Sequence, residues 1–249
     1  MARHKKFQSD SGRPVEEIVH FSDDAHPLVA ETAASLTEGK AGEAERLGAI
    51  FYFVRDEIKY GFPALADTVK ASQTMEARIG QAVTKTTLMA ALCRAAGIHA
   101  RLHFGLIDQS ILRGVLPSAA LAVLPRFSSH AWLEVEIEGR WRRLDTYIMD
   151  KLLFQAARMA LLRKGWKDGF GLACQGGRCG CDLTLEERYF VQMDALTEDH
   201  GLWQDGADYM ASGQYRGMAT VPALVYRRLA AKANRSLEAL RQGHGAAVF

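Results

Sequence analysis

Apolar side chains recur every three or four residues over 43–59 and again over 82–96. This spacing is typical of a helix that packs one face against a core. The second stretch consists largely of strong helix formers and stops at Gly97, a residue type that commonly follows the end of a helix. The first stretch carries its apolar side chains at Leu47, Ile50, Phe51, Val54 and Ile58. We therefore predict two core helices, of which the second is central and buried.

Alternating polarity predicts the strands. Residues 130–137 place His, Trp and two Glu side chains on one face and four apolar side chains on the other. The Glu138-Gly139 pair predicts a tight turn, after which 140–147 return as the antiparallel partner. Residues 99–107 alternate well enough for a further strand. The pattern therefore predicts an α+β fold with a central helix packed on an antiparallel sheet.

The remaining segments suggest three parts of one molecule. We predict a lead segment over 1–40, a core over 41–150 and a C-terminal extension over 151–249 that packs on the same domain. Residues 108–129 are a long connection without a predicted element. Within the extension we expect helices and a Gly-rich loop; the helices span 150–162, 185–195 and 221–241, and the loop spans 165–183.

Composition and charge exclude several classes of protein. The chain has 249 residues, and its 31 basic against 29 acidic side chains give a net charge of +2, which provides no global field for binding nucleic acid. The basic start is not followed by an apolar run, as a secretory signal would be. The longest apolar stretch, 114–125, is far shorter than the ~20 residues of a membrane helix. We expect a cytoplasmic chain with reduced thiols and neither nucleic-acid nor membrane partners.

One pair of polar residues in the predicted hairpin suggests chemistry. If the turn is centred on Glu138 and Gly139, Trp132 lies opposite Asp145, and His130 is the diagonal neighbour of that carboxylate at a Cβ separation of roughly 7 Å. A carboxylate that orients an imidazole supports proton transfer to and from a nucleophile. The same pair also occurs as a plain structural hydrogen bond, so it does not establish catalysis by itself.

Four short motifs in order add to this pair. They are Gly80-Gln81-Ala82 before the central helix, Gly97-Ile98-His99-Ala100-Arg101 at a strand start, HAWLE over 130–134 and GRWRRLD over 139–145. Together they resemble the transglutaminase-like superfamily. The resemblance implies a papain-like α+β fold with a catalytic triad of cysteine, histidine and aspartate. It places the histidine at His130, the aspartate at Asp145 and the nucleophilic cysteine at position 82, which is Ala82 here.

The missing nucleophile is not replaced by a neighbour. Cys93 lies about 16 Å further along the predicted helix, and Thr84 points to a different side of it. Three explanations of Ala82 remain: an engineered Cys-to-Ala change, a natural binding protein without turnover, or an alignment displaced by a few residues. The intact His130 and Asp145 favour the first explanation.

Several side chains are candidates for supporting roles at this site. The side chains of Gln81 and Gln73, with the amide of residue 82, are candidate oxyanion donors. Lys85 would add positive charge near position 82, and Trp132 would exclude water from the site. Each also has a simpler interpretation, the glutamines as turn residues and Trp132 as a packing residue.

A second cluster consists of Cys174, Cys179 and Cys181. These thiols would need a fourth ligand such as His200 to hold zinc, and they lack the paired C-x-x-C spacing of a strong zinc motif. A redox-sensitive pair is an alternative, and a Gly-rich loop that happens to carry thiols is favoured over both. We therefore predict neither a metal nor another cofactor.

These observations predict a function class. The parent activity is cysteine-dependent acyl transfer or hydrolysis of an amide, ester or thioester, in a small molecule or a peptide, by a Cys-His-Asp triad. The chain as written would be inactive because of Ala82. The alternatives are a natural non-catalytic binding module and an interaction protein organised by zinc. The choice between water and an amine as acceptor stays open.

Overall fold

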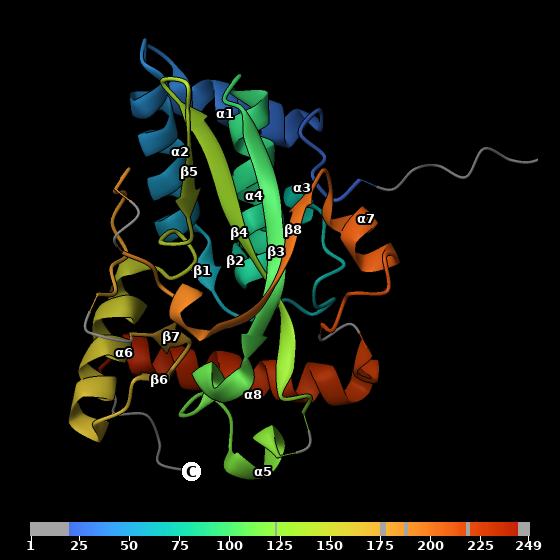
Figure 1. Ribbon diagram of the computed structural model, residues 1–249, viewed down its shortest axis with the longest axis vertical. Coiled ribbons are helices and arrows are strands. Elements are labelled where there is room, and N and C mark those ends of the chain that lie inside the picture. Colours follow the sequence, from blue (N-terminus) through green and yellow to red (C-terminus); the bar gives the residue numbers. More distant parts are fainter. Residues whose placement is uncertain (1–19, 123, 175–177, 187–188, 218–219, 244–249) are drawn as a thin grey trace, which may run out of the picture.

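The computed structural model describes residues 20–122, 124–174, 178–186, 189–217 and 220–243, and shows a four-stranded antiparallel sheet with helices against one face (Figure 1). The strand order is β5–β4–β3–β8. The strands are β3 (Ala100–Asp108), β4 (Phe127–Ile137), β5 (Arg140–Leu144) and β8 (Leu196–Trp203). The predicted α+β class, with a central helix on an antiparallel sheet, is confirmed.

Helix α4 (Ala82–Ala95) forms the centre of the molecule, and every residue from 82 to 93 is buried. It packs on β3 and β4 and is covered on its other sides by three helices. These are α1 (Pro27–Thr37), α2 (Glu43–Glu57) and α3 (Ala71–Ala77). Full burial of a Leu or Met side chain contributes about 1.5–3 kcal/mol, so Leu88, Met89 and Leu92 of α4 each stabilise the core by an amount of that order.

The β4–β5 hairpin has the register that the sequence predicts. Ile137 pairs with Arg140, and Leu133 pairs with Leu144. Glu138 and Gly139 have φ angles of 52° and 72°, the left-handed values that a two-residue type I′ turn requires at both positions. The Glu138-Gly139 pair therefore predicted the turn, and the alternation of polarity predicted the register of the two strands.

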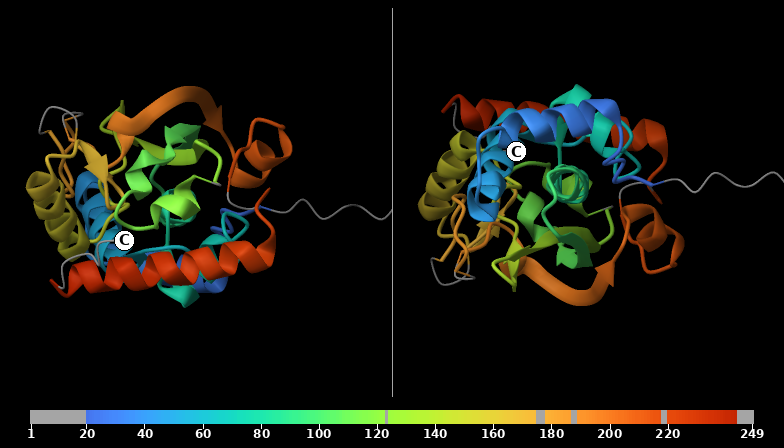
Figure 2. Two further views of the ribbon diagram at one scale, coloured as in Figure 1. Left: turned by 90° about the horizontal axis from the view of Figure 1, so that it is seen from below. Right: turned by 90° about the horizontal axis from the view of Figure 1, so that it is seen from above.

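The C-terminal part packs around the lower end of the sheet. It contains α6 (Lys151–Lys164), β6 (Asp168–Gly169), β7 (Leu172–Ala173), η3 (Met193–Ala195), α7 (Gly206–Ala211) and α8 (Ala223–Arg241). Figure 2 shows α8 on the side of the molecule opposite to β8. The guanidinium of Arg241, at the end of α8, binds the carboxylate of Asp150 at 2.6 Å and the carbonyl of Tyr60 at 2.6 Å. Asp150 caps the start of α6, while Tyr60 ends β1 (Lys59–Tyr60), which pairs with β2 (Ile79–Gly80).

Some elements differ from the sequence prediction. The helix expected over 185–195 is wrong, because the described part of this segment contains only the short η3. The amides of Val191, Gln192 and Met193 donate to the carboxylate of Asp145 rather than to carbonyls four residues earlier.

Residues 108–129 contain η1 (Gln109–Leu112) and α5 (Ser118–Leu121), for which no element was predicted. No helix in the described residues has the length and apolar character needed to cross a membrane.

Candidate functional site

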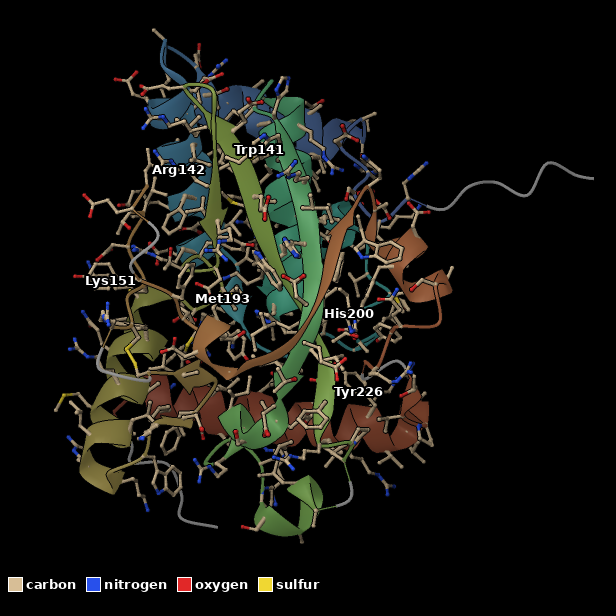
Figure 3. All side chains as sticks on the ribbon, viewed as in Figure 1. Trp141, Arg142, Lys151, Met193, His200 and Tyr226 are labelled. Carbon is tan, nitrogen blue, oxygen red and sulfur yellow. A yellow bond between two sulfur atoms is a disulfide. The ribbon has the colours of Figure 1, made fainter. Side chains whose placement is uncertain are left out.

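A pocket of about 50 Å³ lies between the first turn of α4 and the end of β3, where η1 begins. Its polar lining comes from five elements or loops and consists of Asp67, Gln81, Gln109, Ser128, Ser129, His130 and Gln192. Its apolar lining includes Phe62, Ile107, Leu112 and Tyr226. Tyr226 reaches the pocket from α8 (Figure 3), and its hydroxyl donates to the carbonyl of Pro63 at 2.7 Å. The pocket is thus narrow, mostly apolar and furnished with a few converging polar groups, as ligand sites are.

Ala82 is the first residue of α4 and lines this pocket. The preceding residue, Gln81, caps the helix, since its side-chain oxygen accepts from the amide of Val83 at 2.7 Å. The Nε2 group of Gln81 donates to Asp67. Residue 82 therefore lies at a helix N-terminus, where the helix dipole and free amides stabilise negative charge.

His130 lies in the same pocket, with its side chain almost completely enclosed by protein. Its Nε2 has no hydrogen-bond partner among the described residues. Burial lowers the pKa of His130 to about 3, so the imidazole is neutral at neutral pH. The ring stacks near Trp132, with centroids 6.2 Å apart, and Trp132 in turn stacks on His103 at 4.1 Å. Trp132 therefore lies beside the histidine, but it is not among the residues that line the pocket.

Asp145 is placed differently from the orienting role expected of it. Its carboxylate accepts from the amides of Val191, Gln192 and Met193 at 2.9, 2.8 and 3.1 Å. Burial outweighs these hydrogen bonds and raises the pKa of Asp145 to about 6. Within the part of the chain that the structure describes, no hydrogen bond joins Asp145 to His130. The carboxylate instead fixes the segment that presents Gln192 to the pocket.

Three expected supporting residues, Gln73, Lys85 and Trp132, do not belong to the described lining of the pocket. Gln73 is exposed, and its side chain accepts from the amide of Lys70 at 3.0 Å to cap α3. The Nζ group of Lys85 donates to the carbonyls of Ile58 and Arg55 at 2.5 and 3.2 Å. These carbonyls belong to the end of α2, where the helix dipole favours a cation. Packing with α2 therefore holds the Lys85 amine away from position 82, through contacts that no local sequence pattern predicts.

Gln109, Asp67 and Gln192 also line the pocket, although no motif predicts a role for them. Gln109 and Asp67 lie between predicted elements, and Gln192 lies in the segment interpreted as a helix. A polar residue in an apolar stretch is the one local signal, as for Gln109 in the run LIDQSIL over 106–112. Periodicity gives no indication of which of these side chains share a pocket.

The cysteines form one disulfide, between Cys174 and Cys179, whose Cα atoms are 5.2 Å apart. Cys93 and Cys181 are buried free thiols, and burial raises their pKa values to about 12 and about 11. The zinc-organised alternative is therefore wrong, because two of the three clustered sulfurs are joined and are not thiolate ligands. The expectation of four reduced thiols is wrong as well. No group of His, Cys, Asp or Glu side chains in the described residues is arranged to hold a metal ion.

Comparison with known proteins identifies the core. Residues 30–146 match the family model of the transglutaminase-like superfamily. This segment is a transglutaminase-like domain. It contains position 82, His130 and Asp145, and therefore all the residues on which the resemblance in the sequence rests. The transglutaminase-like domain does not supply the whole pocket, since Gln192 and Tyr226 lie beyond it.

Two solved structures are similar to the chain that contains the transglutaminase-like domain. A putative cysteine protease from Cytophaga hutchinsonii has 17% identity and a TM-score of 0.46, covering 76% of this chain and 46% of that one. A putative protease from Parabacteroides distasonis has 14% identity and a TM-score of 0.35, covering 50% of this chain and 25% of that one. The chain thus spans less than half the length of either protein. No curated protein sequence matches it.

Proposed function

We propose that the pocket is the acyl-binding site of a thiol-dependent acyltransferase or hydrolase, in which residue 82 is the position of the nucleophile. The observation that carries this proposal is that Ala82, at a helix N-terminus, and His130, with an unpartnered Nε2, line one pocket. A helix N-terminus stabilises a thiolate, and a neutral imidazole accepts the thiol proton.

The reaction proposed for a cysteine at residue 82 has two halves. The thiol proton passes to His130, and the sulfur attacks the acyl carbon while the bond to the leaving group breaks. His130 returns the proton to the leaving group, and water or an amine then releases the acyl group by the reverse sequence. The burial that lowers the pKa of His130 is opposed once a thiolate forms beside it, because an opposite charge stabilises the imidazolium.

The proposed oxyanion donors are the amide of residue 82 and the side chain of Gln81. Gln81 is held in place by its bonds to Val83 and Asp67, so it is fixed before a ligand arrives. Asp145 is proposed as a positioning residue that acts through the 191–193 segment. As the chain stands, Ala82 leaves a pocket that binds without turnover.

The test of this proposal is the variant Ala82→Cys treated with iodoacetamide near neutral pH. Rapid alkylation at residue 82 is expected. Mass spectrometry of the labelled peptide measures its rate. The parent chain is the matched control, because its free thiols Cys93 and Cys181 are buried and have raised pKa values, and they should stay unlabelled. Adding His130→Ala should slow labelling by at least 10-fold. Labelling of the introduced thiol at the rate of free cysteine, or without dependence on His130, would contradict the proposal.

A non-catalytic binding module is the second candidate function, and Ala82 itself is the observation that favours it. The two candidates differ in the natural codon at position 82. A cysteine codon in the source gene supports the enzyme, whereas an alanine codon supports a protein that uses the same pocket for binding alone.

A further inference from the structure

Gln109 is a pocket residue whose hydrogen-bonding groups are both unused. It opens η1 directly after β3, and its backbone amide is fixed by a hydrogen bond to the carbonyl of Arg126 at 2.8 Å. Its side chain is buried, with 6% of the residue exposed, and it lines the same pocket as Ala82 and His130. Neither Oε1 nor Nε2 has a hydrogen-bond partner among the described residues. Buried polar groups are rarely left in this state, so a ligand is the natural partner.

The other two glutamines of the pocket are already engaged. Gln81 accepts from Val83 and donates to Asp67. Gln192 donates from Nε2 to the carbonyl of Gly171 at 2.6 Å and to the hydroxyl of Tyr60 at 3.3 Å. Of the three lining glutamines, Gln109 alone presents both a donor and an acceptor to whatever enters.

The geometry of a side-chain amide determines which ligand group complements it. Its oxygen accepts and its nitrogen donates, side by side in one plane. An ester or a thioester offers acceptors only, and an ammonium group offers donors only. A primary or secondary amide in the cis-like arrangement, or the edge of a peptide, offers an N–H and a C=O together.

We propose that Gln109 recognises an amide in this pocket through a pair of hydrogen bonds, and that the ligand class is therefore a carboxamide or peptide rather than an ester or thioester. This inference rests on the proposed function in one respect: the amide that Gln109 recognises lies in the pocket that would hold the acyl group. The apolar lining, including Ile107 and Leu112, keeps water from pairing with Gln109 when an ester binds. Sites built around buried hydrogen-bonding groups reject ligands that lack the matching group.

The test uses the chain with Ala82, which binds without reacting. The probes are three compounds of matched size: butanamide, whose N–H and C=O lie side by side, methyl propanoate and S-methyl thiopropanoate. Binding is followed by NMR through the side-chain NH₂ signals of Gln109 and the ring signals of His130. The amide is expected to bind at least 10-fold more tightly than either ester and to shift the Gln109 NH₂ signals.

The variant Gln109→Leu has a side chain of similar size without hydrogen-bonding groups. It should lose the preference for the amide, with circular dichroism showing that the fold is retained. Gln155→Leu, on the exposed surface of α6, is the matched control and should keep the preference. If Gln109→Leu does not fold, Gln109→Glu provides the second variant, because its carboxylate accepts but does not donate and should also lose the preference. Three results would overturn the proposal. They are equal binding of amide and ester, no binding of any probe up to its limit of solubility, and a preference for the amide that survives both substitutions.

A double variant separates this inference from the proposed function. Ala82→Cys with Gln109→Leu should react with methyl methanethiosulfonate as fast as Ala82→Cys alone, because this thiol reagent carries no amide for Gln109 to bind. An unreactive thiol at residue 82 together with an intact amide preference would overturn the proposed enzyme and leave amide recognition supported. A reactive thiol at residue 82 with no amide preference in the parent chain would overturn the role of Gln109 alone.

Discussion

Lys85 is a fully buried amine that binds the last carbonyls of α2. Burial lowers its pKa from 10.5 to about 7, although the nearby carboxylate of Asp150 acts in the opposite direction. The folded protein therefore releases this proton near neutral pH, whereas the unfolded chain keeps it until much higher pH.

This difference predicts a pH-dependent stability. Between pH 7 and 8.5 the unfolded state binds more protons than the folded state, so the free energy of unfolding should rise with pH, by about 1–2 kcal/mol over the interval. His130 and Asp145, with pKa values of about 3 and about 6, have finished titrating below this range. Urea unfolding at both pH values measures the effect.

Lys85→Met is the matched control for that measurement. It removes the titrating group but keeps an unbranched side chain in the same space, so its stability should change little between pH 7 and 8.5. An equal rise with pH in Lys85→Met would show that another group is responsible.

Single residues were predictable where a motif defined them. His130 of the HAWLE segment lines the pocket, and residue 82 of the tripeptide Gly80-Gln81-Ala82 begins α4. Gln73 and Lys85 were close to position 82 in sequence, but their contacts with Lys70 and α2 depend on packing that no local pattern contains. Gln109 was missed for the same reason, since only the folded chain shows that its amide is buried without partners.

At the scale of elements, a buried ion pair joins the end of α8 to the rest of the molecule. Arg241 and Asp150 have side chains only 7% and 8% exposed. Although burial raises the pKa of Asp150, the hydrogen bonds from Arg241 hold it below its ordinary value. The same carboxylate caps α6 through the amide of Leu153 and accepts from the amide of Tyr60. Three elements therefore depend on this pair.

Removal of Arg241 should be strongly destabilising. Arg241→Ala leaves the Asp150 carboxylate buried without its cation, and the expected loss is about 3 kcal/mol in the free energy of unfolding. The exposed Arg235 on the same helix gives the control, since Arg235→Ala should change stability by less than about 0.5 kcal/mol. Chemical denaturation measures both, and similar effects of the two substitutions would argue against a special role for the ion pair.

Elements with a strong period were predictable, and those shaped by distant contacts were not. The amphipathic stripe of α2 and the alternation in β4 each correspond to an observed element, although β4 is buried on both faces. Residues 190–193 contain apolar side chains that suggested a helix. The amides of residues 191–193 instead donate to Asp145, and the amide of Ala173 donates to the carbonyl of Val191. Such hydrogen bonds join segments that are far apart in the chain, so the local periodicity of apolar residues does not predict them.

For the whole molecule, the Cys174–Cys179 bridge predicts a modest sensitivity to reductants. The two cysteines are five positions apart, and closure of so short a loop stabilises a fold by about 2 kcal/mol through the unfolded state. Treatment with a phosphine reductant should lower the free energy of unfolding by that amount. The double variant Cys174→Ser and Cys179→Ser should show the same loss and no further response to reductant. A response in the double variant would assign the effect to another thiol.

The fold class as a whole was predictable because two helices, a hairpin and a family motif agreed. The pocket was predictable only in part. Its transglutaminase-like side, with position 82 and His130, follows from the motifs, whereas Gln192 and Tyr226 come from the segment after residue 146. That segment has no motif of its own, and its contribution depends on how α8 and the 191–193 segment pack back onto the domain.

The three amides bound by Asp145 have a consequence for genetic experiments. In the variant Ala82→Cys, a genetic selection for loss of function would yield substitutions at Asp145 as well as at residue 82 and His130. The three residues would then look like partners in one proton transfer. Through its hold on Val191, Gln192 and Met193, however, Asp145 acts on the shape of the site. Its alleles should therefore be defective in KM and in growth at high temperature, while alleles of His130 should be defective in kcat alone.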